Sequence, residues 1–440
     1  MDGHDQLAEV VRTEGAKVLA VLVRHLGDWS LAEEAVQEAA IAALQSWPGQ
    51  GVPDEPRAWL TVAAKRKAID VLRREHLRSD KERAAAALAE LTRPEVPDAD
   101  EEDAVDDDLL RLVFTCCHPS LAPEARLALT LKTVCQLSVA AVAEALLTTE
   151  TAMARRLTRT RNKIAVAKIP YRTPTAVELP ERLTSVCSVV HATYTAGHAP
   201  RGGDVVVATD LCAEAVRLAR QLVRLMPDEA DPAAVLALLL LTEARRPARV
   251  DDVGDPVLLA DQDRTRWDAG LIEEGAALLD ASLRRSEGIA DPFQLQAAIA
   301  LEHDRALGYA ATDWAEVVRL YDLLLSVAPS APAALARGVA LAERDGPEAG
   351  LRAVADLPDN VRVRGVRSEL LARCGRYAEA LVALEPRPGD VLTAPERRFR
   401  EARRRAWAER VAVGGWVSGP AAPPAGSSPR PGSAGPRPGS

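Results

Sequence analysis

Two short stretches of the chain carry closely spaced basic side chains that can contact nucleic-acid phosphates. Between Arg57 and Arg83 nine basic residues stand against four acids, and between Arg155 and Arg172 seven stand against none. Guanidinium groups hydrogen-bond phosphate oxygens and the edges of guanine bases. Such runs also occur on ordinary solvated helix faces, so the charge alone leaves both interpretations open.

The second basic stretch lies in a predicted helix-turn-helix. Ser138 stands where an N-cap would open a short helix, and Thr149 stands where a second cap would open a longer one. On that longer helix Arg155, Arg159 and Lys163 recur every four residues and therefore share one face. A basic outer face on the second helix suits the major groove of DNA. An ordinary helical hairpin with a charged surface fits the same pattern equally well.

The first basic stretch is predicted to lie on a helix that follows another helix and a loop. Apolar residues up to Trp47 recur at helical spacing, and Pro48 with Gly49 is expected to end that earlier helix. The apolar face of the next helix is expected to be Trp59, Val62, Ile69 and Leu72. Basic residues fill the positions between them.

The composition excludes several classes of protein. The chain has 440 residues, enough for two to four domains, and only 3% of them are aromatic, which argues against an all-β fold. The longest apolar run, Ala233–Leu241, is too short to cross a bilayer. Six cysteines are too few for a disulfide scaffold, which suits a reducing cytoplasm. We therefore expect a cytoplasmic, all-α, multidomain protein with no membrane partner.

Composition also divides the chain into five segments. They are a helical unit (6–93), an acidic linker (94–108), a second helical unit (109–173), a long helical region (174–411) and a disordered tail rich in Pro, Gly and Ser (412–440). The linker rests on Glu95–Asp108, which holds nine carboxylates and no cation and has almost no apolar surface to bury.

Motifs in the two helical units resemble one known family. They are AEEAVQE (32–38), PRAWL (56–60) and AIDVLRR (68–74) in the first unit, and PEAR (123–126), Leu137-Ser138 and the helix 151–163 in the second. In order and separation these motifs resemble regions 2 and 4 of the extracytoplasmic-function sigma factors, with a linker between them and no region 3. Such a factor binds core RNA polymerase and gives it promoter specificity, without chemistry of its own.

The resemblance implies three sets of contact residues. Core polymerase would be bound by Asp28, Glu33, Glu34, Gln37 and Glu38. The −10 promoter element would be bound by Lys65, Arg66, Asp70, Arg73 and Arg74, and the −35 element by Thr149, Thr151, Arg155, Arg156, Arg159 and Lys163. Where this chain has Arg66 the family often has Asn. A flipped base would need a pocket near the Trp47–Trp59 loop, with Trp59 itself expected in the core.

The segment after residue 174 resembles the long tetratricopeptide-like (TPR-like) extension of one sigma subgroup. Helix pairs are predicted at Trp314–Val327 with Ala331–Arg344, Pro347–Leu357 with Val361–Arg373, and Tyr377–Leu384 with Ala394–Val411. A plain helical bundle remains an alternative. The resemblance implies that this segment regulates the factor and binds a protein or small-molecule regulator. The acidic linker is expected either to thread the nucleic-acid channel of polymerase or to act as a spacer.

Other constellations are set aside. Cys116 and Cys117 beside His118 lack the two-residue gap of a zinc knuckle, so they are expected to be core thiols. No phosphate loop or nucleophile elbow is present, so no catalytic residue, metal, cofactor or enzymatic activity is expected. Two other functions stay open. One is a helix-turn-helix regulator that does not bind polymerase, and the other is a helical-repeat scaffold with a vestigial sigma part.

Overall fold

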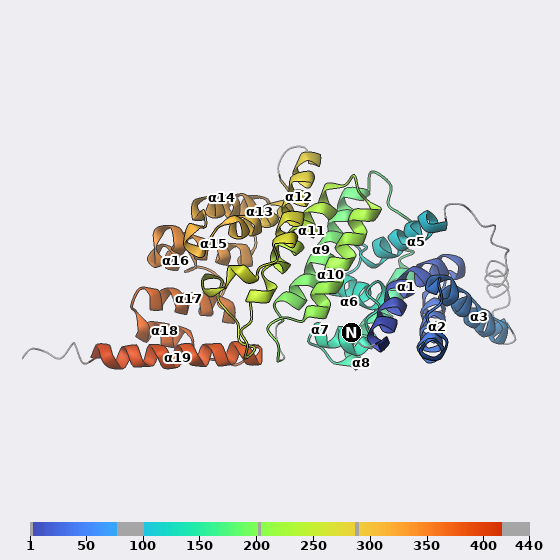
Figure 1. The fold of residues 1–440 in the computed structure, drawn as a ribbon, viewed down its shortest axis with the longest axis horizontal. Helices are drawn as coiled ribbons and strands as arrows, with labels where there is room; N and C mark the ends of the chain where they lie inside the picture. The colour runs from blue at the N-terminus through green and yellow to red at the C-terminus, as the bar shows by residue number, and fades with distance from the viewer. Residues whose placement is uncertain (1–2, 77–100, 201–203, 287–289, 416–440) are drawn as a thin grey trace, which may run out of the picture.

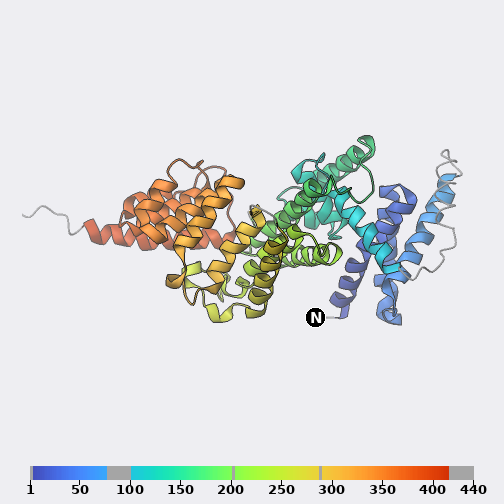
Figure 2. The same cartoon turned by 90° about the horizontal axis from the view of Figure 1, so that it is seen from above.

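The described part of the chain is almost entirely helical (Figure 1). The computed structural model describes residues 3–76, 101–200, 204–286 and 290–415. Within those ranges the one β contact is an isolated bridge between Val250 and Pro256, which confirms the predicted all-α fold. No described helix is both long and apolar enough to cross a membrane. The molecule is elongated, with its first and last helices at opposite ends (Figure 2).

The first three helices form the N-terminal bundle. They are α1 (Gly3–Leu26), α2 (Trp29–Gln50) and α3 (Pro56–His76). The buried face of α3 is Leu60, Ala64, Ala68 and Leu72. Val62, which was expected on that face, is 47% exposed. The correction follows from helix geometry, since Val62 lies about 200° around the helix axis from Leu60.

Both ends of α2 have a defined cap. Asp28 opens the helix, because its carboxylate accepts a hydrogen bond from the Leu31 N–H at 3.1 Å. The helix was expected to end at Pro48-Gly49 but continues to Gln50. It ends at Gly51, whose φ of 85° is open to glycine at little cost and whose N–H donates to the Trp47 carbonyl.

The next four helices form the helix-turn-helix unit. They are α5 (Glu101–Cys116), α6 (Pro123–Thr133), α7 (Val139–Ala145) and α8 (Glu150–Val166). Both predicted caps are confirmed: Ser138 accepts from the Ala141 N–H at 3.0 Å, and Thr149 accepts from the Ala152 N–H at 3.2 Å. Leu147, in the tight turn between α7 and α8, has a positive φ of 49°.

The first half of α5 occupies part of the predicted acidic linker. Residues 101–108 are helical, and Asp108 is only 1% exposed. The expectation that this stretch buries nothing is wrong at its end, because Arg24 and Arg111 contact the Asp108 carboxylate at 3.0 and 2.8 Å. Desolvation nevertheless raises the pKa of Asp108 above its ordinary value, outweighing the two arginines. Residues 94–100 of the linker lie outside the described residues.

The remaining helices form the extension, and its first helices share one hydrophobic core with the helix-turn-helix unit. These are α9 (Leu179–His198), α10 (Thr209–Leu225) and α11 (Ala230–Glu243), on which α12 (Ala269–Arg285) and α13 (Pro292–Arg305) pack. The shared core runs from Phe114 and Leu129 through Val186 to Leu218 and Leu239, each at most 1% exposed. It therefore crosses the boundary predicted at residue 173.

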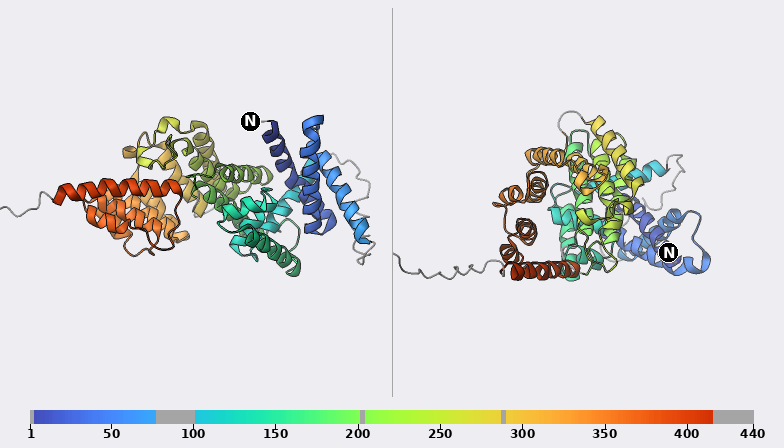
Figure 3. Two further views of the ribbon diagram at one scale, coloured as in Figure 1. Left: turned by 90° about the horizontal axis from the view of Figure 1, so that it is seen from below. Right: turned by 60° about the vertical axis from the view of Figure 1, so that its left-hand side comes forward.

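The last six helices of the extension begin and end close to the predicted bounds. They are α14 (Trp314–Val327), α15 (Ala331–Asp345), α16 (Pro347–Ala353), α17 (Val361–Arg373), α18 (Tyr377–Ala383) and α19 (Ala394–Gly415). Each helix packs on the next, but α16 packs mainly on α15 and α17 mainly on α18, so the predicted pairing of α16 with α17 is not the main contact. The successive helices stack side by side, with α19 along the end of the stack (Figure 3). This stacking is compatible with TPR-like repeats. Residues 412–415, expected in the tail, continue α19, and residues 416–440 lie outside the described residues.

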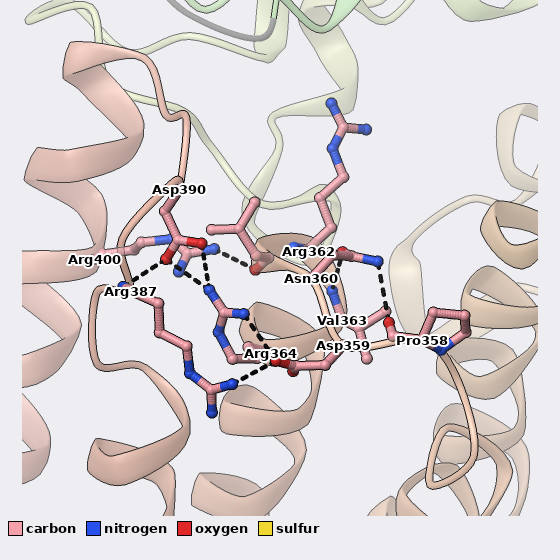
Figure 4. A network of polar contacts seen from close by, with 10 residues as sticks. Pro358, Asp359, Asn360, Arg362, Val363, Arg364, Arg387, Asp390 and Arg400 are labelled. Atoms are coloured by element: carbon pink, nitrogen blue, oxygen red, sulfur yellow. Dashed lines mark hydrogen bonds and ion pairs between the residues drawn. The ribbon is translucent and has the colours of Figure 1, made fainter.

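The buried guanidinium group of Arg364 connects the loop before α17 with the loop before α19 (Figure 4). Arg364 of α17 is 4% exposed and binds both carboxylate oxygens of Asp390, at 2.5 and 2.6 Å. It also reaches Asp359 at 3.2 Å, and Arg387 binds the same Asp359. Because Asp359 precedes α17 and Asp390 precedes α19, the network fixes the two loops relative to each other.

Candidate polymerase and nucleic-acid interfaces

The outer face of α8 carries the predicted basic stripe. Met153 and Leu157 are buried at 0% and 1% exposure, and they turn Arg155 and Arg159 toward solvent on the opposite side. Lys163, also exposed, donates to the backbone carbonyl of Ser120 before α6. The guanidinium groups of Arg155 and Arg159 are therefore available to a groove or a phosphate, although Arg159 Nε donates to the Arg155 carbonyl at 3.4 Å. The Lys163 ammonium group is likewise hydrogen-bonded in the free protein.

The N-terminal turn of α8 offers a second kind of contact. The Thr149 hydroxyl accepts a capping bond and retains its own O–H for donation. Thr151 is exposed and Arg156 is partly buried. Small side chains let a phosphate approach the helix N-terminus, whose free N–H groups and dipole attract anions. The six predicted −35 residues therefore lie together on one helix and its cap.

The predicted −10 residues lie along α3. Arg66 and Arg73 are exposed, Lys65 is partly buried, and Asp70 is exposed. Both Lys65 and Asp70 already interact with other groups. Arg74 belongs to α3, but its side chain lies outside what the structure describes. The exposed side of α3 thus presents guanidinium groups along one helix.

An aromatic pair borders the loop between α2 and α3. Trp47 is 3% exposed and meets Trp59 edge-on, with ring centroids 5.3 Å apart. Trp59 itself is partly buried at the rim of the bundle core. It therefore packs against the core, as expected.

The predicted polymerase residues divide between two directions. Glu34, Gln37 and Glu38 are exposed on the outer face of α2. Glu38 forms a half-exposed ion pair with Lys67 of α3 at 3.2 Å. Asp28 is exposed, and one of its carboxylate oxygens caps the helix. These four side chains are open to a partner.

Glu33 points instead toward the helix-turn-helix unit. Its carboxylate contacts Arg161 of α8 at 2.5 Å and accepts from the Trp29 indole N–H at 3.2 Å. The two charged side chains are only 12% and 19% exposed. Arg161 belongs to the second basic stretch, but no local spacing links it to Glu33, because the two residues are far apart in the chain.

Cys116 and Cys117, which were expected to be core thiols, are buried. They are at most 1% exposed within the shared core, as is Cys135. Burial raises the pKa of Cys117 to about 12 and that of Cys116 well above its ordinary value, so both sulfurs stay protonated. A protonated, enclosed thiol is a packing group rather than a nucleophile.

Three parts of the chain match known protein families. Residues 10–78 match the family described as Sigma-70 region 2, and residues 111–164 match Sigma-70, region 4. Residues 182–283 match a family of unknown function (DUF6596). The uncharacterized protein R00370 of Rhizobium meliloti (strain 1021) is 40% identical over 376 residues, which is 84% of this chain and 88% of that protein. No solved structure matches the chain.

These matches cover the helices that carry the predicted contact residues. The region 2 match covers the N-terminal bundle with α2 and α3, and the region 4 match covers the helix-turn-helix unit up to the C-terminal turn of α8. The alignment with the relative is long enough to include much of the extension as well. The chain therefore belongs to the sigma-70 family, as a factor of the extracytoplasmic-function type whose region 4 is followed by a helical extension containing the DUF6596 segment.

Proposed function

We propose that this sigma factor binds core RNA polymerase through α2 and directs it to promoters through α3 and α8. The observation that carries the proposal is the separation of three exposed faces by chemistry. The face on α2 is acidic, whereas those on α3 and α8 are basic. A chain with net charge −9 does not coat nucleic acid indiscriminately, so two confined basic faces favour specific contact.

The acidic face of α2 suits a basic protein partner. Glu34, Gln37 and Glu38 supply carboxylate and amide oxygens along one side of the helix. The Glu38–Lys67 pair is half exposed, so polymerase can exchange it for its own cation at small cost. Glu33 becomes available to polymerase only when Arg161 releases it.

The face of α3 suits a promoter whose strands are separating. Arg66 and Arg73 can hold phosphates on either side of the opening point. An unstacked base needs a pocket lined by aromatic groups, and the loop 51–55 above Trp59 is the place we assign to it. The cation at Arg66, where the family often has Asn, adds a backbone contact.

The face of α8 suits an intact duplex. Helix N-terminal residues of a recognition helix reach base edges, and later residues of the same helix meet the backbone. Accordingly, Thr151 and Arg155 would read the −35 element, and Arg159 and Lys163 would hold its phosphates. The caps at the starts of α7 and α8 fix the two helices before DNA arrives, which lowers the ordering cost of binding.

We also infer that the extension controls the sigma modules from within the same folded body. The shared core supports this inference, because α9–α11 complete the apolar side of α5 and α6. The ligand or protein that acts on the extension is one whose binding alters how its helices pack on that core. The extension is thus a built-in regulator rather than a tethered neighbour.

The test is binding of the full chain to core polymerase, measured by fluorescence anisotropy. Glu34→Gln with Gln37→Ala should weaken binding about tenfold or more, because each substitution removes a polar group from the proposed contact face of α2. Glu144→Gln, an exposed carboxylate on α7, is the matched control and should leave the affinity unchanged. If the unaltered chain binds promoter duplex but not polymerase, it is a helix-turn-helix regulator instead.

A further inference from the structure

One part of the extension holds buried polar atoms that make no hydrogen bond within the described residues. They lie in two segments, 264–267 and 303–304, and are Arg264 Nη2, Trp267 Nε1, His303 Nδ1 and both carboxylate oxygens of Asp304. We call these four side chains the polar cluster. Buried polar groups are almost always hydrogen-bonded, and an unpaired one, above all a charged one, costs folding free energy. The polar cluster is therefore expected to have a role that outweighs this cost.

The polar cluster lies at the C-terminal end of α13. Arg264 Nη1 donates to the carbonyl oxygen of His303 at 2.6 Å. The Arg264 guanidinium group also lies over the Trp267 ring, 4.3 Å from its centroid. The Asp304 side chain is 0% exposed, and its contact with Arg245 at 3.4 Å is an ion pair without a hydrogen bond. These contacts join the four side chains into one enclosed site.

The segment that carries Arg264 and Trp267 is a long connection between α11 and α12. It covers residues 244–268 and contains only the short 3-10 turns η1 (Arg246–Ala248), η2 (Leu259–Asp261) and η3 (Arg264–Arg266). Connections longer than about 12–15 residues are uncommon in compact domains and are usually functional. The two ends of the segment meet, because the Asp268 N–H donates to the Ala244 carbonyl at 3.0 Å. The segment is therefore a loop that returns to its origin beside α13.

The unpartnered atoms include both donors and acceptors. Arg264 Nη2 and Trp267 Nε1 can only donate, whereas an ionised Asp304 can only accept. Burial raises the pKa of Asp304 to about 6, so the group is a carboxylate at neutral pH. Burial lowers the pKa of His303 to about 4, so this neighbour is neutral and supplies no positive charge to Asp304. Bound water would satisfy such atoms without adding charge, whereas a zwitterion supplies an anion for the donors and a cation for the carboxylate.

We propose that the polar cluster binds a free α-amino acid. Arg264 and Trp267 donate to its carboxylate, and Asp304 accepts from its ammonium group. The Trp267 ring and the Trp314 ring, whose centroid lies 5.4 Å from that of His303, add apolar walls.

The packing of α11 connects this site with the sigma modules. Leu241 packs in a core with Ala297 and Leu301 of α13. Leu239 and Leu240 of α11 belong to the core that the extension shares with the helix-turn-helix unit. We therefore assign the amino acid the part of regulator of the extension. This regulatory role rests on the proposed function, whereas the binding site itself does not.

The first test is isothermal titration calorimetry of the full chain with each of the twenty protein amino acids as the probe. At least one should bind, and Asp304→Asn should weaken its binding about tenfold or more, because a charge-assisted hydrogen bond is lost. Glu302→Gln is the matched control on the same helix, paired only at the surface with Arg305, and should bind normally. Acetate and methylammonium each carry one of the two charged groups and should bind at least about tenfold more weakly than the amino acid.

A second arm measures the melting temperature of the full chain without ligand. Asp304→Asn should melt at the same temperature as the unaltered chain or higher, because the substitution removes a buried charge that has no hydrogen bond to lose. A clear fall would show that Asp304 is a structural partner of Arg245, and the site would be overturned. Binding of none of the twenty probes would overturn it as well, and would leave the polar cluster as a hydrated structural feature.

The regulatory role is tested by transcription with core polymerase and the full chain. The amino acid found by calorimetry should change the transcript level at least twofold, and Asp304→Asn should abolish the response. An unchanged level would refute the regulatory role. If the chain binds the amino acid but not polymerase, the proposed function fails and the binding site stands.

Discussion

Neighbouring carboxylates on α2 should respond in opposite ways to the same substitution. Glu33 is bound to Arg161 within the chain, whereas Glu34 is exposed. We therefore expect Glu33→Gln to favour an open form, in which α2 and α8 no longer contact each other, and to speed association with core polymerase. Glu34→Gln should leave the open fraction unchanged and weaken the complex, because it removes an intermolecular contact.

The size of the Glu33 effect follows from its surroundings. Unit charges 4 Å apart attract by about 4 kcal/mol at an effective dielectric of 20, before desolvation is subtracted. Exposed pairs keep about 0.2–1 kcal/mol of this, and breaking a fully buried pair costs about 3–5 kcal/mol. The Glu33 and Arg161 side chains, at 12% and 19% exposure, lie between these cases. Since Gln can still accept from Trp29, we expect about 1–2 kcal/mol, or a fivefold to thirtyfold shift toward the open form.

Stopped-flow mixing with labelled core polymerase measures the effect. If opening precedes binding, the association rate of Glu33→Gln rises by the same factor as its open fraction, and the dissociation rate stays the same. The reasoning is refuted if Glu33→Gln weakens the complex as much as Glu34→Gln does and leaves the open fraction unaltered. Glu33 would then be a polymerase contact.

Three further results are expected. Arg155→Ala with Arg159→Ala should cost about 1–3 kcal/mol of −35 duplex affinity if either contacts a base, and less if both hold phosphates; Lys168→Ala is the control outside the stripe, and an unchanged affinity would refute the −35 assignment. Gly197→Ala should lower the free energy of unfolding by about 1–3 kcal/mol, because the new Cβ would lie 2.8 Å from a backbone oxygen of the chain facing α9; an unaltered melting temperature would contradict this close approach. Burial lowers the pKa of His198 to about 2, so below about pH 6.5 the unfolded chain takes up a proton that the folded chain does not, and stability falls by up to about 1.4 kcal/mol per pH unit. His198→Gln should reduce that slope in chemical denaturation, and an identical slope would contradict it.

Local patterns predicted the local structure well. The caps at Ser138 and Thr149 and the opposition of Met153 to Arg155 depend on neighbours within four residues, and the structure confirms them. The prediction for Val62 is wrong because it placed Val62 on one apolar face with Trp59, Ile69 and Leu72. The four-residue repeat beginning at Leu60 was the stronger signal.

Contacts between modules could not be predicted in this way. The acidic run before residue 109 was expected to be a linker, because it holds no cation and almost no apolar residue that could be buried. In the fold, Arg24 and Arg224 supply those cations from α1 and α10. The same holds for Glu33, whose partner is brought in by the packing of two separate helical units. Charge patterns report which residues need a partner, and only the tertiary structure reports which partner they have.

The shared core also changes how the extension should be studied. Cutting the chain near residue 175 would expose the sides of Phe114 and Leu129 that α9 and α10 cover. The truncated protein would be expected to lose stability, so its lack of activity would not reveal regulation. Point substitutions at Arg224 and Arg220 leave the core intact, so a change in activity would report regulation rather than lost stability.

The most direct test of the account is transcription with purified core polymerase and the full chain, using the DNA upstream of its own gene as template. We predict a discrete transcript that depends on the chain, is reduced about fivefold or more by Arg155→Ala with Arg159→Ala, and is retained in the Lys168→Ala control. A chain that neither binds core polymerase nor yields such a transcript would contradict the central claim that it is an initiation factor.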